Sequence, residues 1–183
     1  MITIHKALPH DIAVVVGYIE KKAAFDRAMG CFDGKLGTTP ERIAKALFGS
    51  PAFAHALLSA SDEKPVGFAF YHYRFSSFQA RPSLWLDDLF VDANFRRVGA
   101  GVALMSALAT EAIKYDCTHL AWTADDRNPS GIPFYTKIGA TLISQVGSRS
   151  SYSIAPETLA MRRAEIARQN PASDERNPTR DAG

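Results

Sequence analysis

Six residues from Arg96 to Gly101, Arg-Arg-Val-Gly-Ala-Gly, form the part of this sequence best suited to binding a ligand. They lie between an apolar strand pattern, Leu84 to Val91, and a helical pattern, Val102 to Tyr115. Two glycines allow successive backbone N–H groups to turn into one concavity, and the N-terminus of the following helix adds partial positive charge there. The run therefore predicts a binding site for a phosphorylated cofactor.

The same residues exclude two common phosphate-binding loops. A P-loop has Lys and then Ser or Thr after its last glycine, but Val102 and Ala103 follow Gly101. A dinucleotide-binding fingerprint needs a further glycine three residues later, where this chain has Leu104. The pattern that remains is Arg-x-x-Gly-x-Gly.

A second segment accompanies this loop. Asn128-Pro129-Ser130 and then Phe134-Tyr135-x-Lys137-x-Gly139-Ala140 follow a strand-like run that ends at Thr123. In this order, the two segments resemble the two halves of the acyl-CoA site in the GNAT superfamily of N-acyltransferases. From Val66 to Thr141 the chain is similar to the diamine (spermidine/spermine) N-acetyltransferase branch. A fainter match at residues 23–26 extends the resemblance over most of residues 2 to 155.

The resemblance implies that acetyl-CoA is the cofactor. In this family the strand at 84–91 splays from its neighbour, so that the backbones of Leu89, Phe90 and Val91 pair with the pantetheine and polarise the thioester carbonyl. Cys31 and Cys117 lie in no motif, so we expect direct transfer in a ternary complex instead of a covalent acyl-enzyme. The other residues implied to hold the cofactor come from the two segments: Arg96, Arg97, Val98, Gly99, Ala100, Gly101, Val102, Asn128, Ser130, Tyr135 and Lys137.

Asp87 and Asp88 are acidic residues inside an otherwise apolar strand pattern. Strand alternation places them on opposite faces, and the cost of burying a charge requires at least one to face a polar space. We expect Asp88 to point to solvent or to pair with an arginine. The resemblance assigns Asp87 to the incoming amine, with relay through water because family members normally carry the longer Glu. The further substrate-binding candidates are Phe25, Asp26 and Trp122.

The predicted reaction has two proton transfers. An alkyl ammonium with a pKa of ~10 is mostly protonated at neutral pH and cannot attack a thioester, so a carboxylate at Asp87 would hold the cation and pass its proton to solvent. The leaving thiolate, with a conjugate pKa of ~8.5, needs a proton, and the phenol of Tyr135 is the candidate donor. Taken alone, a tyrosine at position 135 could also be a residue of the hydrophobic core. Its position after Asn128 in the matched segment favours a catalytic role.

The amine site departs from the polyamine-acetylating branch. Asp26 and Asp87 stand where the family has Glu, and residues 146–149, Val-Gly-Ser-Arg, replace an acidic residue expected before the last strand. Arg127 stands before Asn128, where the branch usually has an aromatic residue. A second cation near the pocket argues against a long polycation. We therefore expect a small primary amine, such as a diamine or an amino-acid side chain.

Two other functions stay open at this point. The first is a catalytically degenerate GNAT domain that binds CoA as a sensor or partner module, although such a binder needs neither Tyr135 nor an acid at 87. The second is acetylation of a protein N-terminus or lysine.

Composition describes an ordinary soluble globular protein of 183 residues, 46% hydrophobic and 22% charged, with a net charge of +2. This charge and the lack of a Lys/Arg run argue against a nucleic-acid partner. The two cysteines and five histidines show no metal-ligand spacing, so we expect no metal. Without a secretory segment or an apolar run of ~18 residues, we expect a cytoplasmic protein that makes no membrane contact. The resemblance implies a homodimer, with the last strands in the interface.

Hydrophobic periodicity predicts one α+β domain over residues 1–156, with a mixed, mostly antiparallel sheet. A possible C-terminal helix follows at 157–168 and a disordered tail at 169–183. Between the first two helices, Phe25 to Thr38 is predicted to be a loop exposed enough to shape a substrate pocket. The predicted strands are 2–4, 52–59, 66–74, 84–91, 118–123 and a hairpin over 141–152. The predicted helices are 11–24, 39–48, 102–115 and 130–138.

Overall fold

The computed structural model describes residues 1–169, with side-chain burial described to residue 162. The predicted disordered tail lies outside the described residues, except for its first residue. Within residues 1–169 no helix is long and apolar enough to cross a membrane. The same part of the chain gathers no cluster of His, Cys, Asp and Glu that could hold a metal ion.

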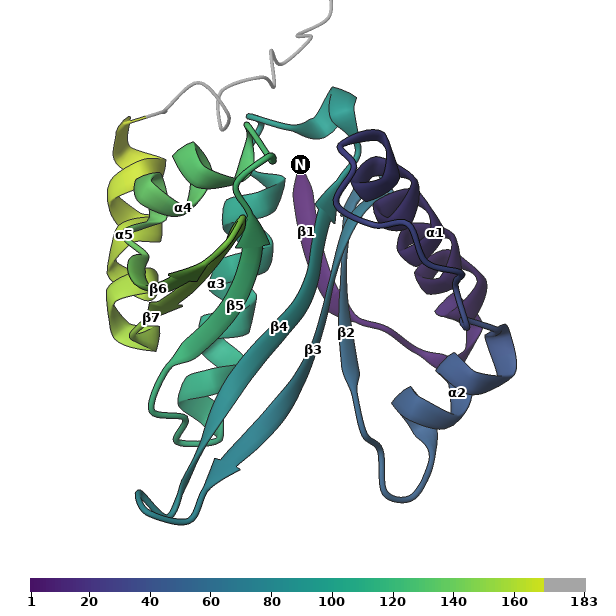
Figure 1. Cartoon of the computed structure of the whole chain (residues 1–183), viewed down its shortest axis with the longest axis horizontal. Coiled ribbons are helices and arrows are strands. Elements are labelled where there is room, and N and C mark those ends of the chain that lie inside the picture. Colours follow the sequence, from purple (N-terminus) through teal and green to yellow (C-terminus); the bar gives the residue numbers. More distant parts are fainter. Residues whose placement is uncertain (170–183) are drawn as a thin grey trace, which may run out of the picture.

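The described residues form one open sheet of seven strands in the order β1-β2-β3-β4-β5-β7-β6 (Figure 1). Neighbouring strands are antiparallel except β4 and β5, which are parallel. The predicted α+β class with a mixed, mostly antiparallel sheet is therefore confirmed. The strands are β1 (Ile2–Lys6), β2 (His55–Ser61), β3 (Lys64–Ser76), β4 (Arg81–Val91), β5 (Leu120–Asp125), β6 (Thr141–Val146) and β7 (Arg149–Ile154).

Helices cover the two faces of the sheet and enclose two apolar clusters. One cluster packs α1 and α2 against β2 and β3, with Tyr18 and Phe68 at its centre. The other packs α3, α4 and α5 against β3, β4, β5 and β7. The helices are α1 (Ile12–Ala28), α2 (Pro40–Phe48), α3 (Ala100–Lys114), α4 (Gly131–Ile138) and α5 (Pro156–Gln169), with short 3-10 turns η1 (Pro9–Asp11) and η2 (Ala93–Phe95).

The helix predicted after residue 156 is present as α5. It packs against α3, and its Leu159 is fully buried in the cluster beneath that helix. The hydrophobic core of the domain therefore includes α5.

The first long helix extends beyond its predicted end at residue 24. It continues to Ala28, and the chain turns at Gly30, whose φ is +68°. No glycine or proline interrupts the chain between residues 18 and 29, so nothing stops the helix earlier. Phe25 and Asp26 consequently lie on the last turns of α1, and not in the loop where the apolar pattern placed them.

Strand β4 carries a bulge at Asp87. In its pairing with β3, Phe70 lies opposite Asp88 and Tyr71 lies opposite Leu86, which leaves Asp87 without a partner. An extra residue of this kind interrupts strand alternation and bends the strand.

The bulge decides where the two acidic side chains point. Leu86 and Leu89 both pack in the cluster beneath α3, although residues three apart in a regular strand face opposite sides. Phe90 packs in the cluster beneath α1. Asp87 and Asp88, between the two leucines, therefore both turn toward α1. The prediction of opposite faces is wrong because it assumed unbroken alternation.

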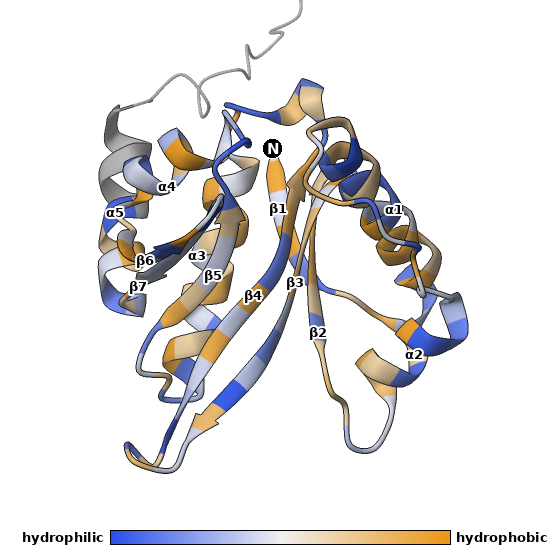
Figure 2. Cartoon of the chain, in the orientation of Figure 1, coloured by the Kyte–Doolittle hydropathy of each residue, from blue (hydrophilic) through white to orange (hydrophobic). Residues whose placement is uncertain are grey.

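Strands β4 and β5 separate beyond the bulge. They pair only at Leu84 with Leu120 and at Trp85 with Ala121. Figure 1 shows them diverging toward the top of the view, and Figure 2 shows hydrophilic residues at the end of β5 and in the turn after it. The splay expected from the family resemblance is therefore present, and it opens the sheet between its two helical layers.

Candidate active site

An open pocket of about 170 Å³ lies where β4 and β5 separate. Its walls come from α1 and the loop after it, from β4, β5 and α4, and from the start of β7. It brings together six of the residues predicted from the sequence to form the site: Asp26, Asp87, Leu89, Trp122, Asn128 and Tyr135.

The glycine-rich loop leads into α3 as the sequence predicted. Gly99 is the N-cap residue in a left-handed conformation, with a φ of +97°, and it has no side chain to cap the helix. The first bond into the helix is from Ala103 N–H to the Gly99 carbonyl, at 2.9 Å. The N–H groups of the first turn, from Ala100 to Val102, have no acceptor inside the helix and can meet an anionic ligand.

The space beside Gly101 is limited by α4 as well. A Cβ at this position would lie 3.4 Å from the ring of Phe134, where α3 meets α4. The position therefore serves helix packing in addition to any role in binding a phosphate.

Arg96 braces the loop against the sheet. Its Nε donates to the Val91 carbonyl at 3.0 Å, and its guanidinium lies over the rings of Phe25 at 5.1 Å and Phe90 at 5.6 Å. The carbonyl of Val91, expected to be free for the pantetheine, is thus already engaged. Of the three strand residues predicted for that role, Leu89 lines the pocket and Phe90 packs beneath α1.

The second predicted segment forms the turn before α4. The Asn128 side-chain oxygen accepts from the Ser130 hydroxyl at 3.0 Å and from the Gly131 N–H at 3.1 Å. Of the cofactor-binding residues predicted in this segment, Asn128 lines the pocket. Ser130, the N-cap residue of α4, and Lys137, on α4, are exposed.

Asp88 lies on the pocket wall, where the sequence suggested a solvent-facing charge. Its side chain is 29% exposed, and an oxygen lies 3.7 Å from Lys22 Nζ. Burial raises the pKa of Asp88, with Asp87 and Asp26 adding to the rise and Lys22 opposing it. Lys22 also forms an ion pair with Asp26 one helical turn along α1. The expectation for Asp88 is wrong, because the bulge turns this carboxylate inward to a lysine.

Asp87 occupies a wetter place on the same wall. Its side chain is 44% exposed, and it accepts from Trp85 Nε1 at 3.0 Å. Its second oxygen lies 3.3 Å from His72 Nδ1. Asp87 therefore connects the pocket to a histidine that is itself partly open to solvent.

Tyr135 approaches the pocket from the α4 side. It is 9% exposed, and its ring packs 5.1 Å from the rings of both Trp122 and Tyr152. Burial raises the pKa of Tyr135 to about 12, with smaller contributions from Tyr152 and Asp26. The phenol therefore keeps its proton at neutral pH and can donate it in a hydrogen bond to a ligand.

Trp122, predicted to bind substrate, lies in the wall between Tyr135 and the sheet. Its indole Nε1 is buried and has no hydrogen-bond partner within the described part of the chain. Trp122 is only 2% exposed, so most of its ring packs in the hydrophobic core.

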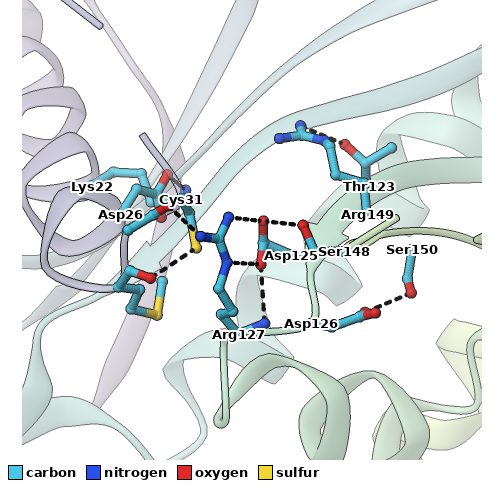
Figure 3. A network of polar contacts seen from close by, with 12 residues as sticks. Lys22, Asp26, Cys31, Thr123, Asp125, Asp126, Arg127, Ser148, Arg149 and Ser150 are labelled. Carbon is cyan, nitrogen blue, oxygen red and sulfur yellow. Dashed lines mark hydrogen bonds and ion pairs between the residues drawn. The ribbon is translucent and has the colours of Figure 1, made fainter. Parts of the chain in front are cut away.

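Arg127 holds two loops together (Figure 3). Its Nε and Nη2 each donate to a different oxygen of Asp125 at 2.8 Å, and its Nη1 donates to the Gly30 carbonyl. These bonds hold the pKa of Asp125 well below its usual range. Arg127 does not itself line the pocket, but it binds Asp125, which does, so it lies near the pocket as the sequence suggested. The pocket cation on this side is Arg149, which reaches the Thr123 hydroxyl at 3.3 Å.

The sequence model of the Acetyltransferase (GNAT) family matches residues 22–140, a segment that contains the glycine-rich loop, both strands of the split and α4. The chain belongs to this family. The family predicted from the two sequence segments is thereby confirmed.

Curated relatives of this GNAT chain act on small amines, by their names. An L-ornithine N5-acetyltransferase of Arabidopsis thaliana is 29% identical over 85 residues, which are 46% of this chain and 37% of the plant enzyme. A thialysine N-epsilon-acetyltransferase of Bos taurus is 24% identical over 147 residues, 76% of this chain and 84% of the bovine enzyme. The match thus spans little more than a third of the plant enzyme but most of the bovine one.

Solved structures share the fold. An integron cassette protein of V. cholerae has a TM-score of 0.62 and 29% identity, covering 80% of this chain and 89% of its own. The PaiA N-acetyltransferase of Thermoplasma acidophilum, solved in complex with coenzyme A, has a TM-score of 0.69 and 15% identity, covering 85% and 99%.

Four charged pocket residues were not predicted from the sequence as site residues: Lys22, Asp88, Asp125 and Arg149. A signal for Asp88 was present, because the apolar residues of β4 at 84, 86, 89 and 91 are spaced two, three and two apart. The three-residue step marks the bulge. Lys22 and Asp26 stand four apart, which is the spacing of an ion pair on one helix face.

Proposed function

We propose that this protein transfers an acetyl group from acetyl-CoA to a primary amine of a small molecule, directly and within a ternary complex. The observation that carries the proposal is the meeting of two kinds of group at one pocket. The carboxylates of Asp26, Asp87 and Asp88 enter from the α1 side, and the protonated phenol of Tyr135 enters from the α4 side.

The cofactor fits the α3 side of the split. The pyrophosphate would lie at the first turn of α3, against the N–H groups of residues 98–102 and beside the exposed Arg97, with Asn128, Ser130 and Lys137 on the α4 side. The pantetheine would follow the unpaired edge of β4 at Leu89 and Phe90. Bound acetyl-CoA supplies the thioester carbonyl that the amine attacks.

The acceptor amine fits the α1 side. An ammonium held by Asp87 and Asp88 must lose a proton before its nitrogen can attack, and that proton passes from Asp87 through water or His72 to solvent. Asp88, with its raised pKa, binds the cation from a drier position and adds negative charge beside Asp87. The wider exposure of Asp87 is what makes it the relay.

Tyr135 serves the departing thiolate. A pKa of about 12 is well above the ~8.5 of a free thiol, so in water the phenol would not give up its proton completely. In the pocket the burial that raises the pKa of Tyr135 also acts on the thiolate, which narrows this difference. The phenol donates a hydrogen bond as negative charge develops on sulfur and gives its proton to the thiolate as it leaves. The second proton, which the nitrogen loses after its attack, then restores the phenol.

The relatives named for L-ornithine and thialysine support a small amine as acceptor. We further propose a homodimer formed at β6, in keeping with the predicted role of the last strands. This strand is one of the two edges of the sheet, and Leu142, Ile143 and Val146 on it are 51%, 62% and 79% exposed. Light scattering on the purified chain tests this assembly. The cytoplasmic location stays a prediction.

The test of function is thiol release from acetyl-CoA across a panel of amines, with mass spectrometry of the products. Turnover with a small primary amine and a product heavier by one acetyl group is the expected result. Binding of CoA without turnover of any amine would instead identify a binding module. Acetylation found only on added protein or peptide would identify a protein acetyltransferase.

A further inference from the structure

We propose that Arg149 binds a carboxylate of the acceptor, so that the preferred substrate is an amino acid carrying a second, primary amine and not a diamine. The inference rests on the proposed function and names the substrate class of the same pocket.

Arg149 lies on the acceptor face of the split sheet. It is the first residue of β7 and pairs across from Asp125 of β5. On β5 the alternate residues Trp122 and Ala124 pack in the cluster beneath α3, so Thr123 and Asp125 face the α1 side. Arg149 shares that face with its cross-strand neighbour, as its contact with the Thr123 hydroxyl and its place in the pocket lining also indicate.

The charge of Arg149 is not used by the fold. Within the described residues its hydrogen bond is to a hydroxyl, and no carboxylate lies within ion-pair distance of it. The other pocket cation, Lys22, is paired with Asp26 and Asp88. Arg149 is therefore the pocket cation left for a ligand.

The neighbouring network explains why Arg149 has no acidic partner. Asp125 is placed directly opposite it, but both oxygens of Asp125 are engaged by Arg127, and one also accepts from the Ser148 hydroxyl at 3.1 Å (Figure 3). The bidentate bond to Arg127 is the strong form of a carboxylate–guanidinium contact. By holding Asp125, Arg127 leaves the second guanidinium free to face the pocket.

The resulting pocket has two poles. Asp87 and Asp88 on β4 suit an ammonium, and Arg149 on β7 suits a carboxylate, so a molecule carrying both groups satisfies both walls. A diamine or polyamine would leave the guanidinium without an anion and would bring a second ammonium near it uncompensated, whereas the carboxylate of a diamino acid offsets the charge of its α-ammonium. Specificity then arises from repulsion as well as attraction.

Matched acceptor pairs test this directly. L-Lysine and cadaverine, and L-ornithine and putrescine, differ only by a carboxylate, and kcat/KM for each is measured with acetyl-CoA saturating. Wild type should prefer the amino acids. Arg149→Gln should raise the KM for L-lysine and L-ornithine by roughly 10- to 100-fold, the loss of a charge-assisted contact, and leave the diamines unchanged or improved. Arg149→Lys should recover part of the amino-acid affinity, which a merely structural role would not produce.

Arg81→Gln is the matched control, because Arg81 is an arginine paired with Asp116 at the far end of β4, outside the pocket. It should leave the amino-acid-to-diamine ratio at the wild-type value. Equal loss for lysine and cadaverine in Arg149→Gln, or a raised KM for acetyl-CoA alone, overturns the inference. So does a wild-type enzyme that acetylates the diamines as well as the amino acids. Failure to acetylate any amine contradicts the proposed function itself, and is distinguishable from these outcomes.

Discussion

On the side of the split sheet covered by α3 and α4, the groups offered to a ligand are mostly backbone N–H groups and one buried phenol. On the α1 side they are charged side chains, four of them carboxylates. The first side depends on a glycine-rich turn and a helix terminus, whose geometry needs particular residues at fixed spacing. The second depends on where a bulge and two loops direct long side chains. The cofactor half of the pocket is therefore determined by a short, continuous stretch of sequence, whereas the acceptor half is assembled from distant segments.

The largest expected effect is on the reacting atoms where the two sides meet. Tyr135→Phe keeps the ring packed against Trp122 and Tyr152 and removes only the hydroxyl. We expect kcat to fall by about 10²- to 10⁴-fold, with the affinity for acetyl-CoA nearly unchanged. Pre-steady-state and steady-state thiol release, with calorimetric binding of CoA, measure the two quantities. Full turnover by the variant would leave Tyr135 as a core residue.

A change on the acceptor side should leave the cofactor side intact. Asp87→Asn removes the charge that holds the ammonium and receives its proton, so the rate with a cationic amine should fall about 10- to 100-fold at pH 7. The loss should shrink as the pH rises toward the pKa of the amine, ~10, where free base exists without help. A pH profile of kcat/KM for the amine checks this. Weakened CoA binding with normal amine turnover would show that Asp87 acts on the cofactor and not on the amine.

The converse change is Gly101→Val. A side chain here crowds the first turn of α3 and presses on Phe134, so the KM for acetyl-CoA should rise about tenfold or more while the KM for the amine stays the same. Gly17→Ala is the control, because a Cβ at Gly17 on α1 meets no atom within 4 Å. If Gly101→Val binds acetyl-CoA as wild type does, the loop holds some other ligand.

The smallest effect concerns stability. Folding raises the pKa of Asp88, so the folded protein holds its proton more tightly than the unfolded chain and loses stability as the pH rises through the folded pKa. Asp88→Asn removes this cost, and we expect a melting temperature about 1–2 °C above wild type at pH 7, with the gain disappearing below pH ~4. Amine affinity should fall at the same time. A variant less stable than wild type at pH 7 would make the ion pair with Lys22 a net stabilising contact.

The loop and helix ends of the cofactor side could be predicted from the sequence, whereas the directions of the acceptor-side side chains could not. The turn through Gly99 into α3 and the end of α4 at Gly139 follow from conformations that glycine adopts readily. The direction in which the side chains of Asp87 and Asp88 point could not be predicted from strand alternation alone, because the bulge arises in the pairing of β4 with β3. Asp125 is bound by Arg127 and not by Arg149, and Arg127 is also held by the carbonyl of Gly30, 97 residues earlier in the chain, a contact that no local pattern predicts.

Direct transfer requires the two sides of the pocket to hold acetyl-CoA and the amine at the same time. Initial rates over a matrix of acetyl-CoA and amine concentrations test it. We expect double-reciprocal lines that intersect, because both substrates must be bound before thiol is released. Parallel lines, together with thiol release from acetyl-CoA in the absence of amine and an acetyl group retained on the protein, would show a covalent intermediate and contradict it.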